Sequence, residues 1–393
     1  MTGSVRPRFE GEQRRPGARP RRLRVLYMIG FLSHAGGAER FVLGLSTNLP
    51  RERFEPWICA PRGAEPAVVS ELAEAGIPLV TLGRRGRWDV HRWAGLPRLL
   101  RRQQFDILHT HMFGSNLWGS VAGRACRVPV VIAQEHTWSY EGNPLRAWLD
   151  GHVVGLLATR FVAVSSADAE RMVAVEGVPP PKVMVIPTAY VPREHPTQAV
   201  DLRAELGLSP DTPLFGTAAV MRRQKALDVL IEAHRLVQKA IPTAHLVLAG
   251  DGPCRDDLER LVAQLGLGLS THFLGRRDDV DSIIRALDVG AMSSDFEGTP
   301  LFALECMTNR TPLVATAVGG LLDIVEPDRT GILVAPRQPA RLAEAITALL
   351  LDPELQMRLA GAAATKLQLY SMDAIVSRFG GLYETLVRQA GAG

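Results

Sequence analysis

The stretch SSDFEGTPLFALECMTNRTPLVATAVGG, residues 293–320, holds two carboxylates eight positions apart, Glu297 and Glu305. The residues DVGAMS that lead into it are a short apolar run, typical of a buried strand. Thr299 suits the N-cap of a helix, and Pro300 suits its first position, where the missing N–H costs nothing. The pattern therefore predicts a strand, a loop that carries Glu297, and a helix with Glu305 in its early turns.

This arrangement has a chemical meaning. A strand, a glycine-containing loop and a helix N-terminus form the usual anion-binding corner of an α/β sheet, because free N–H groups and the helix dipole favour a phosphate there. Two carboxylates beside that corner can accept hydrogen bonds from sugar hydroxyls. Together these groups predict a site for a nucleotide-sugar. A second interpretation stays open, since exposed glutamates flank many helix starts without binding a ligand.

A longer pattern surrounds these residues. E-G-x-P-x-x-x-x-E, followed by P-L-V-A-T-x-x-G-G and T-G-I-L-V, extends without a gap from Ser293 to Val334. It resembles the donor-site signature of glycosyltransferase family 4 (glycosyl transferases group 1), which are retaining enzymes of the GT-B fold. The resemblance implies an α/β protein with two Rossmann-like domains, each a doubly wound parallel sheet, that face each other across a cleft. It also implies metal-independent transfer of a sugar from a nucleotide-sugar, with UDP as the expected carrier and GDP second, to a hydroxyl acceptor.

The length of 393 residues suits two domains rather than one. A proline-rich segment, Thr188–Pro196, has the composition of an interdomain linker. We expect a disordered basic tail at 1–22, an acceptor-side domain at 23–190, a donor domain at 197–370 and a last helix at 371–393. The resemblance implies that this last helix crosses back onto the N-terminal domain.

Composition excludes several classes of protein. Apolar residues make up 46% of the chain and charged residues 22%, as in ordinary globular proteins. No apolar run approaches the roughly 18 to 20 residues of a membrane span, and the Arg- and Pro-rich first 24 residues lack the apolar core of a signal peptide, so we expect a cytoplasmic protein. The four cysteines form no C-x-x-C pair, which predicts reduced thiols and no metal site. The basic charge is concentrated in the tail, so nucleic acid is not a predicted partner. No cofactor is expected.

The N-terminal domain opens with a strand, LRVLYMIG at 23–30, a loop that ends in Gly36 and Gly37, and an amphipathic helix at 38–49. This order is typical of the first unit of a doubly wound sheet. G-G-A-E-R at the start of the helix resembles the first loop of family 4 N-terminal domains. The resemblance implies that the two glycines let the backbone approach the donor phosphate and the acceptor.

Histidines occur near two predicted strand ends. The apolar strand Val128–Gln134 leads to Glu135 and His136, at the carboxyl edge where ligands of such sheets bind. The resemblance implies that His136 contacts the donor sugar and is essential; the alternative is a histidine with ordinary structural hydrogen bonds. His109 and His111 lie in D-I-L-H-T-H, which resembles a family strand end, and we expect one of them to bond to backbone near the cleft. H-x-H without a carboxylate does not predict a metal site.

The second domain offers two basic residues ahead of a predicted helix at 226–240, Arg222 and Lys225. A lysine at a strand-to-helix loop is well placed to neutralise a pyrophosphate leaving group. In the family this loop reads G-R-L-x-x-x-K, and Val220 occupies the usual arginine position, so we assign the role to Arg222. The family's N-G-x-D loop is replaced by Thr188-Ala189-Tyr190-Val191. Both departures keep open an alternative, a glycosyltransferase-like protein that binds a nucleotide-sugar without turnover.

The resemblance also implies the roles of the remaining residues. Glu305 accepts hydrogen bonds from both ribose hydroxyls, and Glu297 contacts hydroxyls of the transferred sugar. Retention without a protein nucleophile implies front-face attack, with the leaving phosphate taking the acceptor's proton. The donor site is completed by backbone around Gly298, Thr299, Pro300 and Leu301 and by Arg276, where the family's backbone pairs with the base.

The acceptor side carries less information. Residues 84–104 mix arginines with Trp88 and Trp93, which is typical of an interfacial segment, although Gly95 and Pro97 interrupt any long helix. Two interpretations remain: peripheral contact with the inner membrane face, which the basic tail would share, or a surface loop with a docked helix. By analogy with the fold, we expect a glycan or glycolipid acceptor, such as a lipid-linked or cell-surface glycan precursor.

Overall fold

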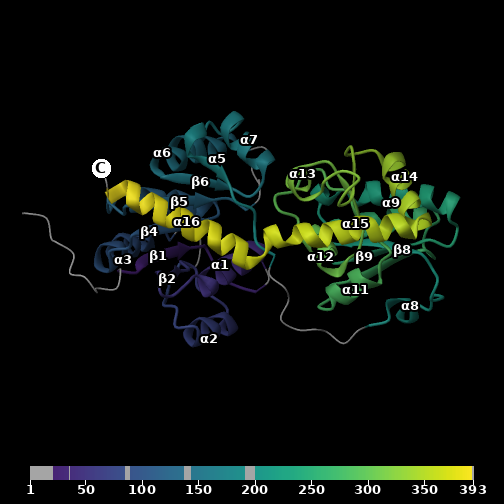
Figure 1. Ribbon diagram of the computed structural model, residues 1–393, viewed down its shortest axis with the longest axis horizontal. Coiled ribbons are helices and arrows are strands. Elements are labelled where there is room, and N and C mark those ends of the chain that lie inside the picture. Colours follow the sequence, from purple (N-terminus) through teal and green to yellow (C-terminus); the bar gives the residue numbers. More distant parts are fainter. Residues whose placement is uncertain (1–20, 35, 85–88, 137–142, 191–199, 392–393) are drawn as a thin grey trace, which may run out of the picture.

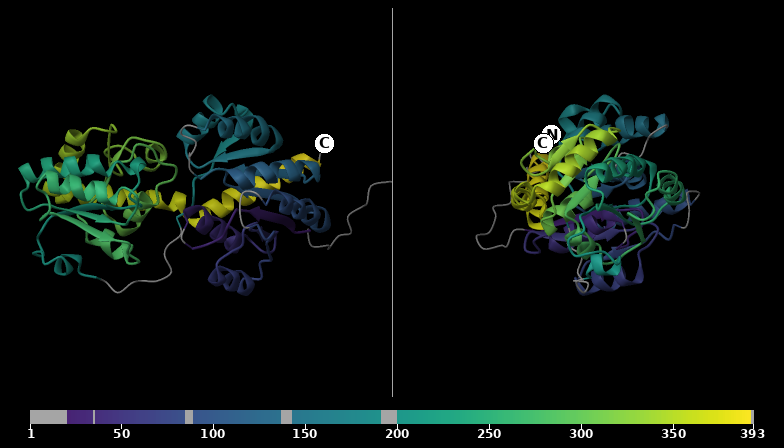
Figure 2. Two further views of the ribbon diagram at one scale, coloured as in Figure 1. Left: turned by 180° about the vertical axis from the view of Figure 1, so that it is seen from behind. Right: turned by 90° about the vertical axis from the view of Figure 1, so that its right-hand side faces the viewer.

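The computed structural model describes residues 21–34, 36–84, 89–136, 143–190 and 200–391. The described elements form two α/β domains, each built on one parallel sheet with helices on its faces (Figures 1 and 2). This confirms the predicted GT-B fold class. The expected tail lies outside the described residues except at its last two positions, and so does most of the expected linker.

The first domain contains a seven-stranded sheet with the order β3-β2-β1-β4-β5-β6-β7. All its strand pairs are parallel, and β4 and β5 are buried along their whole length, as a sheet covered on both faces requires. The strand order reverses between β1 and β4, and ligands of such sheets bind at that point. The strands are β1 Leu23–Met28, β2 Phe54–Cys59, β3 Leu79–Val80, β4 Ile107–His111, β5 Val130–Gln134, β6 Arg160–Ala163 and β7 Val183–Val185.

Helices connect these strands. A single helical segment between β5 and β6 includes a π-helical stretch, η2, in its middle. The helices are α1 Gly37–Asn48, α2 Pro66–Glu74, η1 Val90–Ala94, α3 Gly95–Gln103, α4 Phe113–Ala125, α5 Pro144–Leu149, η2 Asp150–Val154, α6 Gly155–Leu157, α7 Ser166–Ala174 and η3 Pro180–Lys182.

The second domain contains a six-stranded parallel sheet with the order β10-β9-β8-β11-β12-β13, which reverses between β8 and β11. Its strands are β8 Leu214–Ala218, β9 His245–Ala249, β10 Thr271–Gly275, β11 Val289–Met292, β12 Leu313–Thr316 and β13 Ile332–Val334. Its helices are α8 Leu202–Glu205, η4 Arg223–Lys225, α9 Leu227–Ala240, α10 Arg255–Gln264, α11 Val280–Ala286, α12 Leu301–Asn309, α13 Leu321–Ile324, α14 Pro339–Leu351, α15 Pro353–Lys366 and η5 Leu367–Tyr370.

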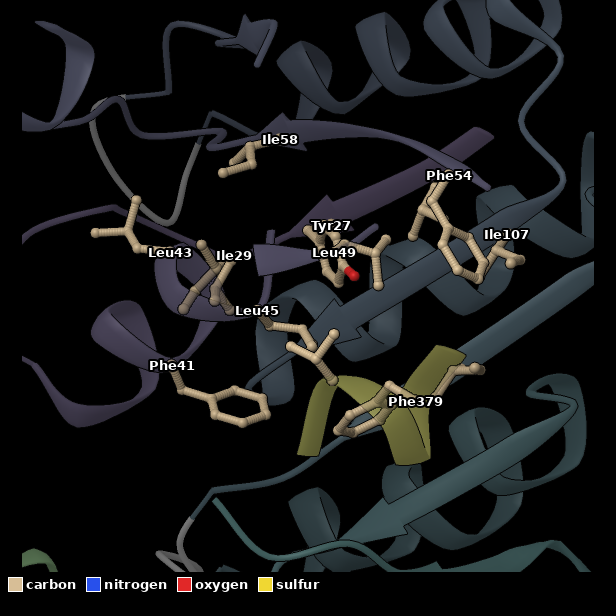
Figure 3. Packing of buried hydrophobic residues seen from close by; sticks show 14 of the residues in the cluster. Tyr27, Ile29, Phe41, Leu43, Leu45, Leu49, Phe54, Ile58, Ile107 and Phe379 are labelled. Carbon is tan, nitrogen blue, oxygen red and sulfur yellow. The ribbon is translucent and has the colours of Figure 1, made fainter. Parts of the chain in front are cut away.

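The last helix, α16 Met372–Gly391, packs on the first domain although it follows the second. Figure 1 shows α15 against the second sheet and α16 continuing across the first. Phe379 and Tyr383 of α16 are fully buried in the first domain's core, where Phe379 meets the edge of Phe41 from α1 (Figure 3). The helix is therefore part of the first domain's core.

The two chain crossings between the domains lie beside each other. The amide of Tyr190, at the end of the first domain, donates to the carbonyl oxygen of Tyr370, and Tyr190 forms a parallel bridge with Ser371. This backbone pairing holds together the two segments in which the chain passes from one domain to the other.

The arginine- and tryptophan-rich segment is partly buried. Trp93 is 6% exposed, its ring stacks on that of Trp118, and the guanidinium of Arg84 lies over it. Trp93 is therefore a core residue and does not face an interface, while Trp88 lies outside the described residues. No helix in the described part of the chain is long and apolar enough to span a bilayer.

Candidate functional site

Lys225 and Glu297 lie in the connections that follow β8 and β11, the two strands at the reversal point of the second sheet. Lys225 Nζ donates to Glu297 Oε1 at 2.6 Å, and the hydroxyl of Ser294 donates to the same oxygen at 2.6 Å. The side chain of Glu297 is 5% exposed and that of Lys225 is 21% exposed. The structure thus joins two residues 72 positions apart into one buried ion pair.

Backbone contacts hold the two loops together. The hydroxyl of Ser293 donates to the carbonyl oxygen of Lys225, and the amide of Asp295 donates to that of Gln224. On the other side, a Cβ at Gly319 or Gly320 would clash with the carbonyl oxygens of Glu297 and Gly298 respectively. The Gly-Gly pair of the sequence pattern is therefore required for close approach of one loop to another.

The predicted start of α12 is one residue too early. The helix begins at Leu301, so Pro300 and not Thr299 is the N-cap, and no side-chain capping hydrogen bond forms. The hydroxyl of Thr299 instead donates to the carbonyl oxygen of Val164 and accepts from the amide of Thr188, both in the first domain. Interdomain contact has taken the hydroxyl that a local cap would use.

Glu305, in the second turn of α12, is buried at 5% exposure and faces the first domain. A small pocket lies between the domains, lined by Glu305 and Leu301 from α12, Gly37 and Arg40 from α1, and Ala189 and Tyr190 from the first crossing. A Cβ at Gly37 would touch the side chain of Leu301. The N-termini of two helices therefore face each other across this pocket.

Sequence reasoning missed Arg40. This cation occupies the first turn of α1, and its amide donates to the carbonyl oxygen of Gly36. The helix dipole disfavours a cation near a helix N-terminus, so an arginine there indicates a negatively charged partner. The arginine that follows the Gly-Gly loop in the sequence was therefore a signal of an anionic ligand. Its side chain lines the same pocket as Glu305.

Three histidines lie at the first domain's carboxyl edge. His109 Nδ1 is 2.7 Å from the hydroxyl oxygen of Tyr383, and His111 Nδ1 is 3.0 Å from His136 Nε2. The rings of His109 and His111 are in contact, with centroids 4.2 Å apart. The expectation that one of the pair bonds to backbone is wrong, because both histidines bond to side chains. A Cβ at Gly298 would lie 2.6 Å from the carbonyl oxygen of His136, so His136 meets the Glu297 loop.

Burial keeps these rings neutral. Desolvation lowers the pKa of His109 and of His136 to about 3, and it lowers the pKa of His111 well below its ordinary value. Behind them, burial raises the pKa of Glu135, with the nearby carboxyl of Asp150 adding to the effect. The edge is therefore a neutral, polar and largely dry surface.

This burial predicts acid instability. An unfolded histidine binds its proton at the ordinary pKa of 6.5, whereas the folded rings resist it to about pH 3. Above pH 6.5 the histidines therefore do not lower the free energy of unfolding. As pH falls from 6.5 toward 3, each ring lowers it by about 1.4 kcal/mol per pH unit. Glu135, with its raised pKa, offsets part of this loss. Urea unfolding at pH 7.5, 6 and 5 should show the decline, and His111→Asn should make it shallower; equal stability at all three values would contradict the assignment.

The remaining predicted residues are more exposed. Arg222 and Arg276 are surface residues beside β8 and β10, and within the described chain no ion-pair partner is found for Arg222. Val220, at the family's usual arginine position, is also half exposed. The neighbouring Arg277, in contrast, pairs with Asp279 and Glu205. Among the described residues, no group of three potential ligands could hold a metal ion.

Comparison with known families matches both halves of the chain. Residues 200–366 match the family described as "Glycosyl transferases group 1", and residues 35–193 match "Glycosyltransferase Family 4". The two matched segments contain the second domain's loops and the histidine edge respectively. Gly36, Gly37 and Arg40 fall inside the second of these matches.

Curated relatives extend over most of the chain. A D-inositol 3-phosphate glycosyltransferase of Xylanimonas cellulosilytica is 30% identical over 376 residues, covering 86% of this chain and 89% of that one. The alpha-D-kanosaminyltransferase of Streptomyces kanamyceticus is 29% identical over 309 residues, covering 73% and 79%. A UDP-Gal:alpha-D-GlcNAc-diphosphoundecaprenol alpha-1,3-galactosyltransferase of Escherichia coli is 26% identical, covering 76% and 80%.

Solved structures share the fold. Anabaena Alr3699/HepE in complex with UDP superposes with a TM-score of 0.78 at 20% identity, covering 93% of this chain and all of that one. Sucrose-phosphate synthase from Thermosynechococcus elongatus gives a TM-score of 0.72 at 21% identity, covering 94% and 100%.

Proposed function

This chain belongs to the group 1 glycosyltransferases of family 4, and from that premise we propose that it is a retaining, metal-independent enzyme that moves a sugar from a UDP-sugar to a hydroxyl acceptor. One observation carries the proposal. The Lys225–Glu297 ion pair lies before the N-terminus of α12, with Glu305 on the same helix and His136 against the same loop. Lys225 suits the leaving diphosphate, Glu297 and His136 suit the sugar on one side of it, and Glu305 suits the ribose on the other.

The ion pair suggests how the free site accommodates buried charges. Without substrate, Lys225 and Glu297 compensate each other, which avoids the cost of an isolated buried charge. A bound donor offers replacements for both, since its diphosphate can accept from the ammonium and its sugar hydroxyls can donate to the carboxylate. In this proposal the diphosphate anion replaces Glu297 as the partner of Lys225, and the carboxylate of Glu297 exchanges its cation for neutral hydroxyl donors of the sugar.

The proposed chemistry needs charge stabilisation at the departing phosphate. Lys225 supplies a cation, Arg40 lies across the pocket, and the free N–H groups of α12 and α1 add two helix dipoles. These groups would do the work that a metal does in other transferases. We propose front-face attack, in which the leaving phosphate oxygen takes the proton of the acceptor hydroxyl while the new glycosidic bond forms on the face that the diphosphate leaves.

The choice of UDP rests on what related proteins bind. HepE was solved with UDP and with UDP-glucose, and the Escherichia coli relative is named for a UDP-galactose donor. That same relative acts on a diphosphoundecaprenol-linked sugar by its name. We therefore propose a glycan or lipid-linked glycan acceptor for this chain, at a hydroxyl group presented to the histidine edge.

Turnover of a donor panel tests the proposal. The purified protein is incubated in EDTA with UDP-, GDP-, ADP- and CDP-glucose, UDP-galactose and UDP-N-acetylglucosamine, with and without simple glycoside acceptors, and nucleoside diphosphate release is measured. We expect UDP release that Glu297→Gln abolishes, and an axial linkage retained in the product. Binding of UDP without release from any donor would favour the non-catalytic alternative, and dependence on an added divalent ion would overturn the metal-independent mechanism.

A further inference from the structure

One helical segment of the first domain carries apolar side chains on its solvent side. It consists of α5, η2 and α6, which run without a break, and its side chains at 145, 148, 152 and 156 are exposed. Three of these four are large and apolar: Leu145 is 65% exposed, Trp148 51% and Leu156 57%. These three residues, the apolar stripe, have the spacing of one side of a helix. Figure 1 shows α5 and α6 at the margin of the first domain, beside α7.

The buried side of the same segment is less apolar than the exposed side. It contains Asp150, Gly151, Val154 and Gly155. A surface helix normally has the opposite pattern, with its leucines and aromatic residues toward the core. The apolar stripe therefore contributes little to the core, and an exposed apolar surface of this kind indicates a binding partner.

Charge identifies the kind of partner. The helices α3, α4 and the α5–α6 segment pack on the face of the first sheet that lies opposite α1, α2 and α16. Among the described residues of these helices the only carboxylate is that of Asp150, which is buried, whereas arginines are exposed on α3 and at the end of α4. These exposed arginines are Arg98, Arg101, Arg102, Arg124 and Arg127. The helices α2 and α16 of the other face carry acidic residues, Glu71, Glu74, Asp373 and Glu384.

Cations also lie at the Leu156 end of the apolar stripe. Lys182 Nζ donates to the carbonyl oxygen of Ala158 at 2.9 Å, two residues beyond Leu156. Burial lowers the pKa of Lys182, and the nearby charges of Arg124 and Arg160 add to the effect. Three cations therefore gather where the helical segment ends.

From this arrangement we infer that the face formed by α4, α5 and α6 docks on an anionic phospholipid bilayer: the apolar stripe enters the head-group region, and Arg124 and Arg127 pair with lipid phosphates. Tryptophan and leucine along one side of a helix, with cations beside them, is the combination by which helices lie in a bilayer interface. A second copy of the chain fits this face poorly, because a twofold contact would bring the same cations toward each other.

The apolar stripe begins near the histidine edge. Leu145 precedes Arg146, whose guanidinium lies 4.4 Å from the ring centre of Phe113. Phe113 is the first residue of α4 and follows His111, the end of β4, by two positions. A docked bilayer would thus lie beside the carboxyl edge of the first sheet. Delivery of an acceptor from that bilayer rests on the proposed function, whereas the docking itself does not.

Sedimentation with vesicles tests the docking on the full-length protein. Vesicles of phosphatidylcholine, with and without about one-third phosphatidylglycerol, are compared at low and high salt. We expect binding to the mixed vesicles that salt weakens. Trp148→Ser with Leu156→Ser should lower the partition coefficient at least about tenfold, because two apolar side chains no longer enter the interface. Arg124→Gln with Arg127→Gln should lower it about tenfold on the mixed vesicles only.

A matched control comes from the second domain. Leu269 is 94% exposed and Met357 70% exposed, and neither lies on the proposed face. Leu269→Ser with Met357→Ser removes two exposed apolar side chains as the stripe variant does, and it should bind vesicles like the wild type. Circular dichroism melting of both paired variants shows that each is folded.

Trp148 itself gives the second readout. Lipids brominated in their acyl chains quench tryptophan fluorescence on contact. We expect quenching in the wild type that Trp148→Phe largely loses, while its partition coefficient stays within about threefold because phenylalanine is also apolar and aromatic.

Several results would overturn the inference. Binding that the paired serine variant leaves unchanged, or binding without quenching of Trp148, would assign the contact to another part of the chain, such as the Arg-rich first 24 residues. Equal binding to neutral vesicles, or binding to none, would also contradict it. So would a dimer in vesicle-free solution that the paired serine variant dissociates, since a second copy would then cover this face. These measurements do not use diphosphate release, so the docking and the proposed function can fail separately.

Discussion

Replacing Lys225 by methionine should lower the rate of diphosphate release by about a thousandfold, because in the proposed mechanism Lys225 is the cation that stabilises the leaving group. It should also lower the free energy of unfolding. Glu297 is buried and loses its ion-pair partner, and a fully buried pair broken in this way costs about 3 to 5 kcal/mol. Because Lys225 is one-fifth exposed, we expect about 2 kcal/mol. Steady-state release assays and urea unfolding measure the two effects on the same preparation.

Two further variants separate the rate from the stability. Lys225→Met with Glu297→Gln removes both charges, so stability should return toward the wild type while the rate stays low. Arg203→Met breaks a comparable pair, Arg203–Asp288, at the amino end of the same sheet. It should destabilise the fold and leave the rate per folded molecule near that of the wild type. A Lys225→Met enzyme with a near-normal rate would refute the role of Lys225.

Much of the fold could be predicted because buried parallel strands are short apolar runs in the sequence. Strands such as β5, with every residue buried, must be apolar almost throughout, and the predicted strand at 128–134 matches β5 at Val130–Gln134. The helix α7 had a readable signal that the predictions passed over: Ser165 caps it by accepting from the amide of Asp168. The π-helical stretch in the preceding helix had no such signal, and the close approach of its Gly151 to the backbone of Glu176 is visible only in the folded structure.

The site divides differently. Motif resemblance could name Glu297, Lys225 and His136 singly, but it could not show what each contacts. The ion pair of Glu297 depends on two loops that meet only when β8 and β11 are adjacent. The bond between His111 and His136 depends on the register of β4 and β5, which places His111 opposite Gln134. Such side-chain pairs depend on the order and register of the strands, so they could not be predicted from a single sequence.

Glu305→Ala should abolish the stabilisation of the protein by UDP. A nucleotide that binds only the folded state at about 100 times its Kd raises the free energy of unfolding by about 2.7 kcal/mol. Glu305 lies buried in the interdomain pocket, where its two carboxylate oxygens can each accept from one hydroxyl of a ribose diol. Each lost hydrogen bond to a charged group is worth roughly 1.5 to 3 kcal/mol. Unfolding midpoints with and without millimolar UDP, GDP, ADP and CDP measure the effect.

The two hydroxyls of the ribose determine how much of the UDP stabilisation each Glu305 variant should keep. Glutamine keeps one acceptor oxygen and presents an NH₂ group to the second hydroxyl, so Glu305→Gln should retain part of the UDP effect and Glu305→Ala none. Glu344→Ala serves as the control, because this carboxylate is exposed on α14 and pairs with Arg341 on the same helix. It should keep the full UDP effect. If Glu305→Ala were stabilised by UDP as strongly as the wild type, the nucleotide would have to bind elsewhere, and the assignment of Glu305 to the ribose would be wrong.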